Sequence, residues 1–210
     1  MPINKTQLIS WLNKLNTVYT DKKEYLTELD AAIGDADHGI NMNRGFSKVI
    51  EKLPTVESKD IGTILKTVGM TLMSSVGGAS GPLYGTFWMK GGMVLANKEE
   101  INSEDFYKFI EAGVGGILLR GRPNLGDKTM YDLWAPVLEK IKECADNGDD
   151  VSAIVDTILP VGEKALADTI PLQAKKGRAS YLGERSIGHQ DPGATSSFYM
   201  LETLKEVLAS

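Results

Sequence analysis

Hydrophobic side chains recur along most of this chain with the spacing of an α-helix. The clearest stretch lies near the N-terminus, where the apolar positions are Leu8, Ile9, Trp11, Leu12, Leu15, Val18 and Tyr19. Intervals of three and four residues place such side chains on one face of a helix. No segment alternates convincingly with the period of two that a half-buried strand requires. We therefore predict an all-α fold of eight or nine helices, formed by residues 1–210 as a single domain.

The same periodicity predicts the other helices. We expect a short second helix from Lys22 to Ala32 that ends at Gly34. The remaining expected helices cover Asn41–Leu53, Ile61–Ser75, Leu83–Ala96, Glu104–Leu119, Met130–Cys144, Val151–Asp168 and Pro192–Leu208. Asp60, Ser103 and Asp191 are placed where N-caps belong, and Pro192 suits a first helical turn. Tyr84, Phe87 and Trp88 are expected in the core.

The amino-acid composition argues against several classes of protein. The formal net charge of -5 argues against a nucleic-acid-binding protein, which needs a basic face. A single cysteine and two histidines argue against a disulfide framework and a zinc centre. We see no signal peptide and no apolar run long enough for a membrane helix, so we expect a cytoplasmic protein without a membrane partner.

A cluster of three aspartates is the strongest chemical signal. Asp30, Asp35 and Asp37 lie within eight residues and are followed at once by His38 and Gly39. Crowded carboxylates repel one another, and a hard cation such as Mg2+ relieves that repulsion. Aspartate and glycine are also common in polar turns, so the spacing alone leaves a metal site and a solvated turn open.

Glycine is concentrated in four segments between predicted helices. One is the aspartate loop, and the others are residues 74–82, 121–129 and 175–193. A loop of small residues that leads into a helix N-terminus exposes backbone N–H groups and can bind an anion. Such loops also make tight helix connections, but four of them beside a carboxylate cluster favour phosphate binding.

The loop at 121–129 imitates a P-loop without matching it. Gly121 and Gly126 have the right separation, but Asp127 intrudes before Lys128 and Thr129. The segment also follows a helical pattern, whereas a P-loop follows a strand. We therefore reject a P-loop fold for this chain.

Two residues near these loops have more than one interpretation. Arg178 stands between Gly177 and Ala179, so its guanidinium could reach a phosphate, although exposed arginines are usually only solvated. Met130 is equally suited to the core and to an apolar wall beside an adenine ring.

Long motifs connect the chain to a known family. The Gly-Asp-Ala-Asp-His-Gly run at 34–39, the Gly-Gly-Ala-Ser-Gly loop at 77–81 and the Gly-Arg-Ala-Ser-Tyr-Leu-Gly-Glu-Arg run at 177–185 resemble the nucleotide-binding L subunits of dihydroxyacetone kinases. The resemblance extends over essentially the whole chain. It implies an eight-helix antiparallel, barrel-like bundle with a nucleotide site in the loops at one rim.

The resemblance also implies the site residues. Asp30, Asp35 and Asp37 would hold two Mg2+ ions against the phosphates of ADP or ATP, and Arg178 would be catalytic. The implied nucleotide contacts are His38, Gly39, Ile40, Asn41, Gly78, Ala79, Ser80, Gly121, Met130, Arg178, Asp191, Pro192 and Gly193.

The family contains two types of kinase that differ in length. ATP-dependent members fuse this domain to a dihydroxyacetone-binding domain in a much longer chain. A chain of 210 residues resembles the phosphotransferase-system form, in which bound ADP is rephosphorylated by a phosphohistidine on an M subunit and gives its γ-phosphoryl group to dihydroxyacetone on a K subunit. We also expect a homodimer. A regulatory module that binds a transcription regulator, or a kinase subunit for another small acceptor, remains an alternative.

Overall fold

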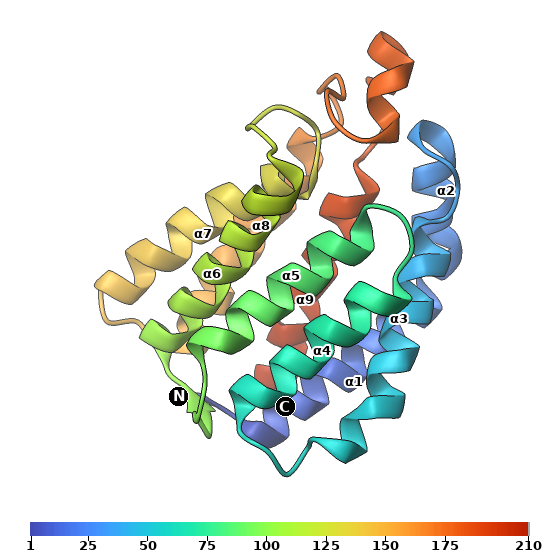
Figure 1. Ribbon diagram of the computed structural model, residues 1–210. Coiled ribbons are helices and arrows are strands. Elements are labelled where there is room, and N and C mark those ends of the chain that lie inside the picture. The colour runs from blue at the N-terminus through green and yellow to red at the C-terminus, as the bar shows by residue number, and fades with distance from the viewer. Residues whose placement is uncertain (210) are drawn as a thin grey trace.

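Residues 1–209 are described by a computed structural model, in which helices pack side by side around a common core (Figure 1). The α-helices are α1 (Lys5–Asp21), α2 (Lys23–Ile33), α3 (His38–Lys52), α4 (Ile61–Ser75), α5 (Ser80–Val94), α6 (Ser103–Gly121), α7 (Met130–Asp146), α8 (Val151–Asp168) and α9 (Pro192–Leu208). The 3-10 helices are η1 (Leu53–Thr55) and η2 (Arg178–Ser186), and the strands are β1 (Ile3–Asn4) and β2 (Glu100–Ile101).

Eight of the helices form a closed ring. Contacts run from α1 to α3, then through α4, α5, α6, α7 and α8 to α9, which returns to α1. Helix α2 packs against α3 and α9 at one end of the ring. Short connections join α4 to α5 and α7 to α8, so these neighbours run antiparallel. This arrangement confirms the predicted all-α, barrel-like bundle.

Aromatic side chains fill the interior of the ring. The rings of Trp11 and Trp88 are 5.1 Å apart, and those of Phe87 and Trp134 are 5.0 Å apart. Tyr84, Phe87 and Trp88 are at most 2% exposed, as predicted. Such large buried surfaces dominate the energetics of a core.

Several helix ends differ from the predictions. Helix α3 begins at His38 rather than Asn41, and α5 begins at Ser80 rather than Leu83. Neither start is capped by the side chain of its own N-cap residue, so the usual sequence signal for an N-terminus is missing. The N-cap of α6 is Asn102, whose side chain accepts the Asp105 N–H, and the assignment of Ser103 was wrong by one residue.

Other predictions of helix ends are confirmed. Asp60 caps α4 and Asp191 caps α9, with Pro192 as the first helical residue. Helix α2 ends at Gly34. The strands β1 and β2 form a two-residue antiparallel pair, which is too short to produce a recognisable alternation in the sequence.

Among residues 1–209, each helix is too short or too polar to cross a lipid bilayer.

Candidate functional site

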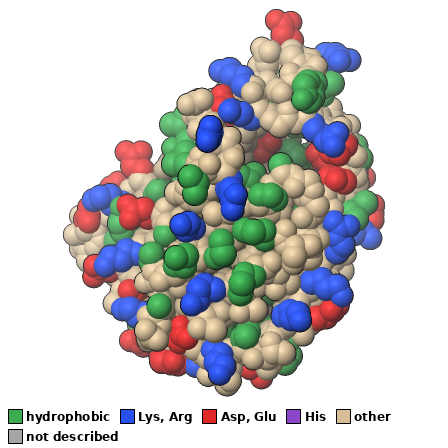
Figure 2. Space-filling model, viewed as in Figure 1, with side chains coloured by type: hydrophobic (Ala, Val, Ile, Leu, Met, Phe, Trp, Pro, Cys, Tyr) green, Lys and Arg blue, Asp and Glu red, His purple; other side chains and the backbone are tan. Residues whose placement is uncertain are grey.

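A cavity of about 340 Å³ opens at the end of the ring where α3, α5, α7 and α9 begin. Figure 2 shows the molecule hollowed at this end, beneath the projecting segment that Figure 1 colours orange. Most of the residues implied by the family resemblance line it. They are Asp30, Asp35, Asp37, His38, Gly78, Ala79, Ser80, Gly121, Met130, Arg178, Asp191, Pro192 and Gly193.

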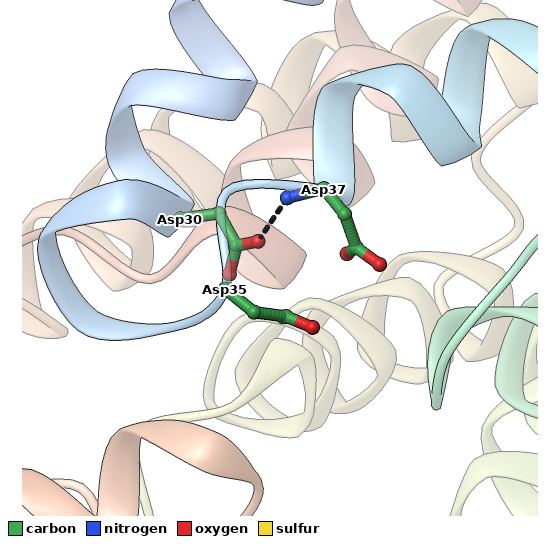
Figure 3. Close-up of side chains that lie close together, drawn as sticks. All are labelled: Asp30, Asp35 and Asp37. Atoms are coloured by element: carbon green, nitrogen blue, oxygen red, sulfur yellow. Dashed lines mark hydrogen bonds between the residues drawn. The ribbon is translucent and has the colours of Figure 1, made fainter.

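The three aspartates lie together on one wall of this cavity (Figure 3). A carboxylate oxygen from each can be chosen so that the three atoms lie within 4.8 Å of one another. Asp30 is buried at the end of α2, and its Oδ2 accepts the N–H groups of Asp37 (2.8 Å) and His38 (3.2 Å). Those two bonds fold the loop back over α2 and bring the other two carboxylates to the same side of the chain.

Two small residues make this turn possible. A Cβ at Gly34 would lie 2.1 Å from Oδ1 of Asp30, so any other residue there would collide with that carboxylate. Ala36 has a φ of 59°, in the left-handed region that most side chains avoid. The turn that brings Asp35 and Asp37 beside Asp30 therefore requires an unfavourable backbone conformation at Ala36.

The donor set suits a hard divalent cation. All three groups are carboxylates, the ligands that Mg2+ and Ca2+ prefer, and sulfur and imidazole are absent from the cluster. The backbone N–H groups that donate to Oδ2 fix the position of the Asp30 carboxylate beside the other two. The aspartate cluster can therefore hold a cation against negative charge in the cavity.

The glycine loop 77–79 and the start of α5 form another wall of the cavity. Gly78 is exposed, has a φ of 61° and has open space where a Cβ would lie. The N-cap position, Ala79, offers no side-chain acceptor to the first N–H groups of α5. These unpaired donors and the positive end of the helix dipole are suited to a phosphate.

The other three helices that begin at the cavity are already capped. Thr129 accepts the Tyr131 N–H at the start of α7, and Asp191 accepts the Ala194 N–H at the start of α9. At the start of α3, the carboxylate of Asp30 takes the same role. The N-terminus of α5 is thus the one among these four that is left open for an anion.

His38 connects the aspartate cluster to two other helices. Its Nδ1 lies 3.1 Å from the Ser80 hydroxyl, and its Nε2 lies 2.8 Å from the Ser196 hydroxyl. The hydroxyl of Tyr84 in turn lies 2.6 Å from that of Ser196. Burial lowers the pKa of His38 to about 4, against the opposing effect of nearby carboxylates. The side chain therefore acts as a neutral link between the starts of α3, α5 and α9.

Arg178 reaches the aspartate cluster from the projecting segment. Its Nε lies 3.0 Å from Oδ2 of Asp35, although the arginine side chain is 70% exposed. The ion pair brings together residues that are far apart in the sequence. It places a guanidinium at the mouth of the cavity, next to the carboxylates.

Part of the cavity lining is apolar. Met130 and Pro192 contribute apolar surface there, as do Leu83 and Ile117. Met130 is 5% exposed and belongs to the hydrophobic core, which confirms its predicted place in the core. Because it also lines the cavity, a contact with an adenine ring stays a prediction. An apolar slot of this kind suits a flat ring.

Asp191 carries an unusual carboxyl group. The pKa of this group is raised to about 7, mainly by burial, and the nearby Asp132 and Asp30 act in the same direction. The Ala194 N–H and the Lys128 ammonium act in the opposite direction. The carboxyl is thus close to half protonated near neutral pH.

Three of the expected contacts lie slightly away from the cavity. Gly39, Ile40 and Asn41 occupy the first turn of α3 and are not among the residues from 1–209 that line it. A Cβ at Gly39 would lie 1.9 Å from the Lys23 carbonyl oxygen, so the close packing of α3 on α2 requires glycine at this position. These residues remain predicted nucleotide contacts.

Sequence reasoning missed several lining residues. Leu83 and Ile117 lie one helical turn from Ser80 and Gly121, so helical spacing could have found them. Lys128 also lines the cavity, although the P-loop comparison had set it aside. Helix α6, not a strand, precedes its loop, which supports the rejection of a P-loop.

The chain is similar over nearly its whole length to proteins of known function. The chain is 50% identical over 204 residues to the ADP-binding subunit DhaL of the PEP-dependent dihydroxyacetone kinase of Escherichia coli, covering 97% of each chain. It is 44% identical to the corresponding subunit of kinase 1 of Listeria innocua, over the full length of both.

The fold also matches solved structures. The dihydroxyacetone kinase of C. freundii in complex with AMP-PNP and Mg2+ aligns with a TM-score of 0.72 at 20% identity. That alignment covers 98% of this chain and 34% of the kinase, so the chain spans about a third of that protein. The family model for the DAK2 domain matches residues 32–206, which include nearly all of the cavity. Together with the relatives of similar length, this match shows that the chain belongs to the DAK2 domain family.

Proposed function

We propose that this chain is the ADP-binding subunit of a phosphoenolpyruvate-dependent dihydroxyacetone kinase. In this reaction ADP stays bound as a coenzyme and is rephosphorylated by a phosphohistidine on an M subunit. Its γ-phosphoryl group then passes to dihydroxyacetone on a K subunit. The similarity to the DhaL subunits of E. coli and L. innocua, which covers nearly all of this chain, supports the proposal.

One observation carries the proposal. A cavity holds a cluster of three carboxylates together with the N-terminus of α5, whose first N–H groups have no side-chain acceptor. The carboxylates alone would repel a nucleotide, and the helix N-terminus alone would attract any small anion. Cations bound to the carboxylates remove their repulsion of a phosphate. A nucleoside diphosphate with Mg2+ supplies both the cations for the carboxylates and the phosphate for the helix N-terminus.

Each group then has a definite role. Asp30, Asp35 and Asp37 would hold two Mg2+ ions, which supply positive charge to the phosphate oxygens when bound. The N–H groups at Gly78–Ser80 hold phosphate oxygens, and the apolar part of the lining holds the base. Phosphoryl transfer depends mainly on such positioning and on neutralisation of charge.

Arg178 is the proposed catalytic residue. Its guanidinium lies at the mouth of the cavity, where it can stabilise negative charge that develops on the phosphoryl group during transfer. A general base on this chain is unnecessary, because the acceptor hydroxyl is held by the partner subunit in this proposal.

Reconstitution tests the proposed function. The chain is combined with K and M subunits and phosphoenolpyruvate-driven phosphotransferase proteins, after free nucleotide has been removed. We expect dihydroxyacetone phosphate to form without added ATP, many times over for each chain. A requirement for free ATP in amounts equal to the product would contradict a resident coenzyme.

Substitution at the cluster provides the matched comparison. Asp35→Asn is expected to abolish metal loading and transfer while the helical circular dichroism is kept. The exposed Asp146, which pairs with Lys142 on α7, provides the control substitution Asp146→Asn. Full activity of Asp35→Asn would overturn the metal assignment.

The proposed assembly has further parts. We propose a homodimer and a cytoplasmic location, with the K and M subunits meeting the open mouth of the cavity. Light scattering coupled to size-exclusion chromatography distinguishes a dimer from a monomer.

A further inference from the structure

Lys128 is a buried lysine whose role the nucleotide site does not explain. Its side chain is 1% exposed, and its ammonium donates to three backbone carbonyls. They belong to Ile170 (3.2 Å), Leu172 (3.0 Å) and Ser186 (2.8 Å). An ammonium has three N–H donors, so these bonds occupy all of them. The group is therefore not free to bind phosphate as a P-loop lysine does.

Two of these carbonyls bound the segment that carries Arg178. We define residues 173–185 as the arginine loop, which includes most of η2 and belongs to the orange projection in Figure 1. Leu172 precedes it and Ser186 follows it. A single ammonium thus joins both ends of a loop that extends from the ring.

Further bonds close the same base. The Ala174 N–H donates to the Ser186 hydroxyl at 2.9 Å, and the Lys175 N–H donates to the Asp127 carbonyl at 3.0 Å. Between these ends the loop is largely exposed, as Tyr181 shows with 87% exposure. Towards the site, η2 packs on α2, and Arg178 forms an ion pair with Asp35. Exposed ion pairs stabilise weakly, so that pair alone is a poor anchor for the loop.

The backbone conformation at Lys128 indicates that the lysine side chain has a specific role. Its φ is 62°, a left-handed conformation that glycine or asparagine adopts more readily than lysine. The position therefore combines an unfavourable backbone with a buried charge, which burial makes costly. Such a combination persists where the side chain serves a purpose.

We propose that Lys128 is a positioning residue, whose ammonium fastens both ends of the arginine loop and so holds Arg178 over the aspartate cluster. The kinetic part of this proposal rests on the proposed function. The structural part, the fastening of the loop, does not.

Limited trypsin digestion tests the fastening. The arginine loop contains four cleavage sites: Lys175, Lys176, Arg178 and Arg185. Lys128→Met keeps the apolar stem of the side chain and removes the donors. We expect cleavage within 173–185 to become about tenfold faster or more, as local opening increases, with products located by mass spectrometry. Lys164→Met, an exposed lysine on α8, is the control and is expected to match the wild type.

Folding is checked first by circular dichroism. If Lys128→Met melts below the assay temperature, Lys128→Gln replaces it, since its amide can still donate to one or two of the carbonyls. Cleavage in the arginine loop that is unchanged in the folded variant would overturn the proposal.

A double-substitution cycle with Arg178→Ala tests the kinetic consequence. If Lys128 acts through Arg178, the Lys128 substitution slows transfer in the wild type but adds nothing in the Arg178→Ala background. Nucleotide retention is expected to change much less than the transfer rate. Losses that multiply in the double variant would mean that Lys128 acts only through general stability. If the wild type itself transfers nothing, the proposed function fails, while the trypsin result still decides the fastening.

Discussion

At Asp191, burial of a single carboxyl group makes stability depend on pH. Its pKa in the folded protein is raised to about 7, from about 4 in an unfolded chain. The folded state therefore retains a proton that the unfolded state has lost. The resulting contribution to stability is complete below pH 4 and is lost as the pH rises to 7, by up to about 1.4 kcal/mol per pH unit.

Replacement by asparagine isolates this effect. Asp191→Asn keeps an acceptor for the Ala194 N–H but removes the charge, so the pH-dependent loss disappears. His38 has the opposite sign, because its lowered pKa removes stability as the pH falls from 6.5 towards 4. The measurement is therefore the difference in unfolding free energy between the two proteins, from urea titrations in chelator at several pH values. A difference that stays constant from pH 4 to 7 would contradict the assignment.

At Arg178, the geometry predicts an effect on rate more than on binding. Its guanidinium stands at the mouth of the cavity and is well exposed, so it contributes little to holding ADP. Arg178→Ala is expected to slow phosphoryl transfer by about 100-fold or more. Nucleotide retention, measured by equilibrium dialysis, should weaken far less. Equal losses in the two measurements would assign Arg178 to simple binding.

On the scale of elements, α4 and α5 approach so closely that their backbones touch. Gly62 and Gly69 on α4 face Gly85 and Gly92 on α5. A Cβ at Gly69 would lie 2.5 Å from the Met89 N and 2.6 Å from the Gly85 carbonyl. Because the two helices join through the glycine loop 77–79, their contact also sets the position of the phosphate-binding wall.

An alanine substitution in this contact should force the helices apart. We expect Gly69→Ala to destabilise the protein by about 2 kcal/mol or more. Gly115 on α6 has open space around its Cβ position, so Gly115→Ala should stabilise by about 0.5–1 kcal/mol. Chemical denaturation measures both. Equal effects of the two substitutions would show that the α4–α5 contact is looser than described.

The sequence predicted the elements better than their ends. Apolar spacing identified all nine α-helices of residues 1–209, because each buries one face against its neighbours. The starts of α3 and α5 were missed, since the N-cap residue of neither helix makes a side-chain cap. At α3 the acceptor is Asp30 on the preceding helix, and at α5 there is no side-chain acceptor. Such ends therefore carry no N-cap residue that the sequence pattern could identify.

The site was predictable only in part for a related reason. The aspartate cluster is local in sequence, and its spacing was visible. The pairing of Arg178 with Asp35 and the burial of Lys128 depend on how the ring closes, which no local pattern reports. Family motifs supplied residues such as Gly121 and Asp191 that spacing alone would not have joined.

At the scale of the whole molecule, ring closure creates the site. The aspartates come from the first part of the chain, the glycine loop from the middle, and Asp191–Gly193 from the last part. They meet because α9 returns to α1 and α3, which places the start of α9 beside the starts of α3 and α5. The cavity is therefore a property of the complete ring, and a ring opened at α9 should lose it.

The nucleotide and metal content of the purified protein shows whether the aspartate cluster holds a nucleotide through cations. The chain is incubated with ADP and Mg2+, stripped of free ligand by gel filtration, denatured and analysed for nucleotide and metal. We expect ADP equimolar with the wild-type chain, together with Mg2+, and neither in Asp35→Asn. A wild-type protein that retains no nucleotide, or an Asp35→Asn variant that retains both, would contradict a nucleotide held through cations on the aspartate cluster.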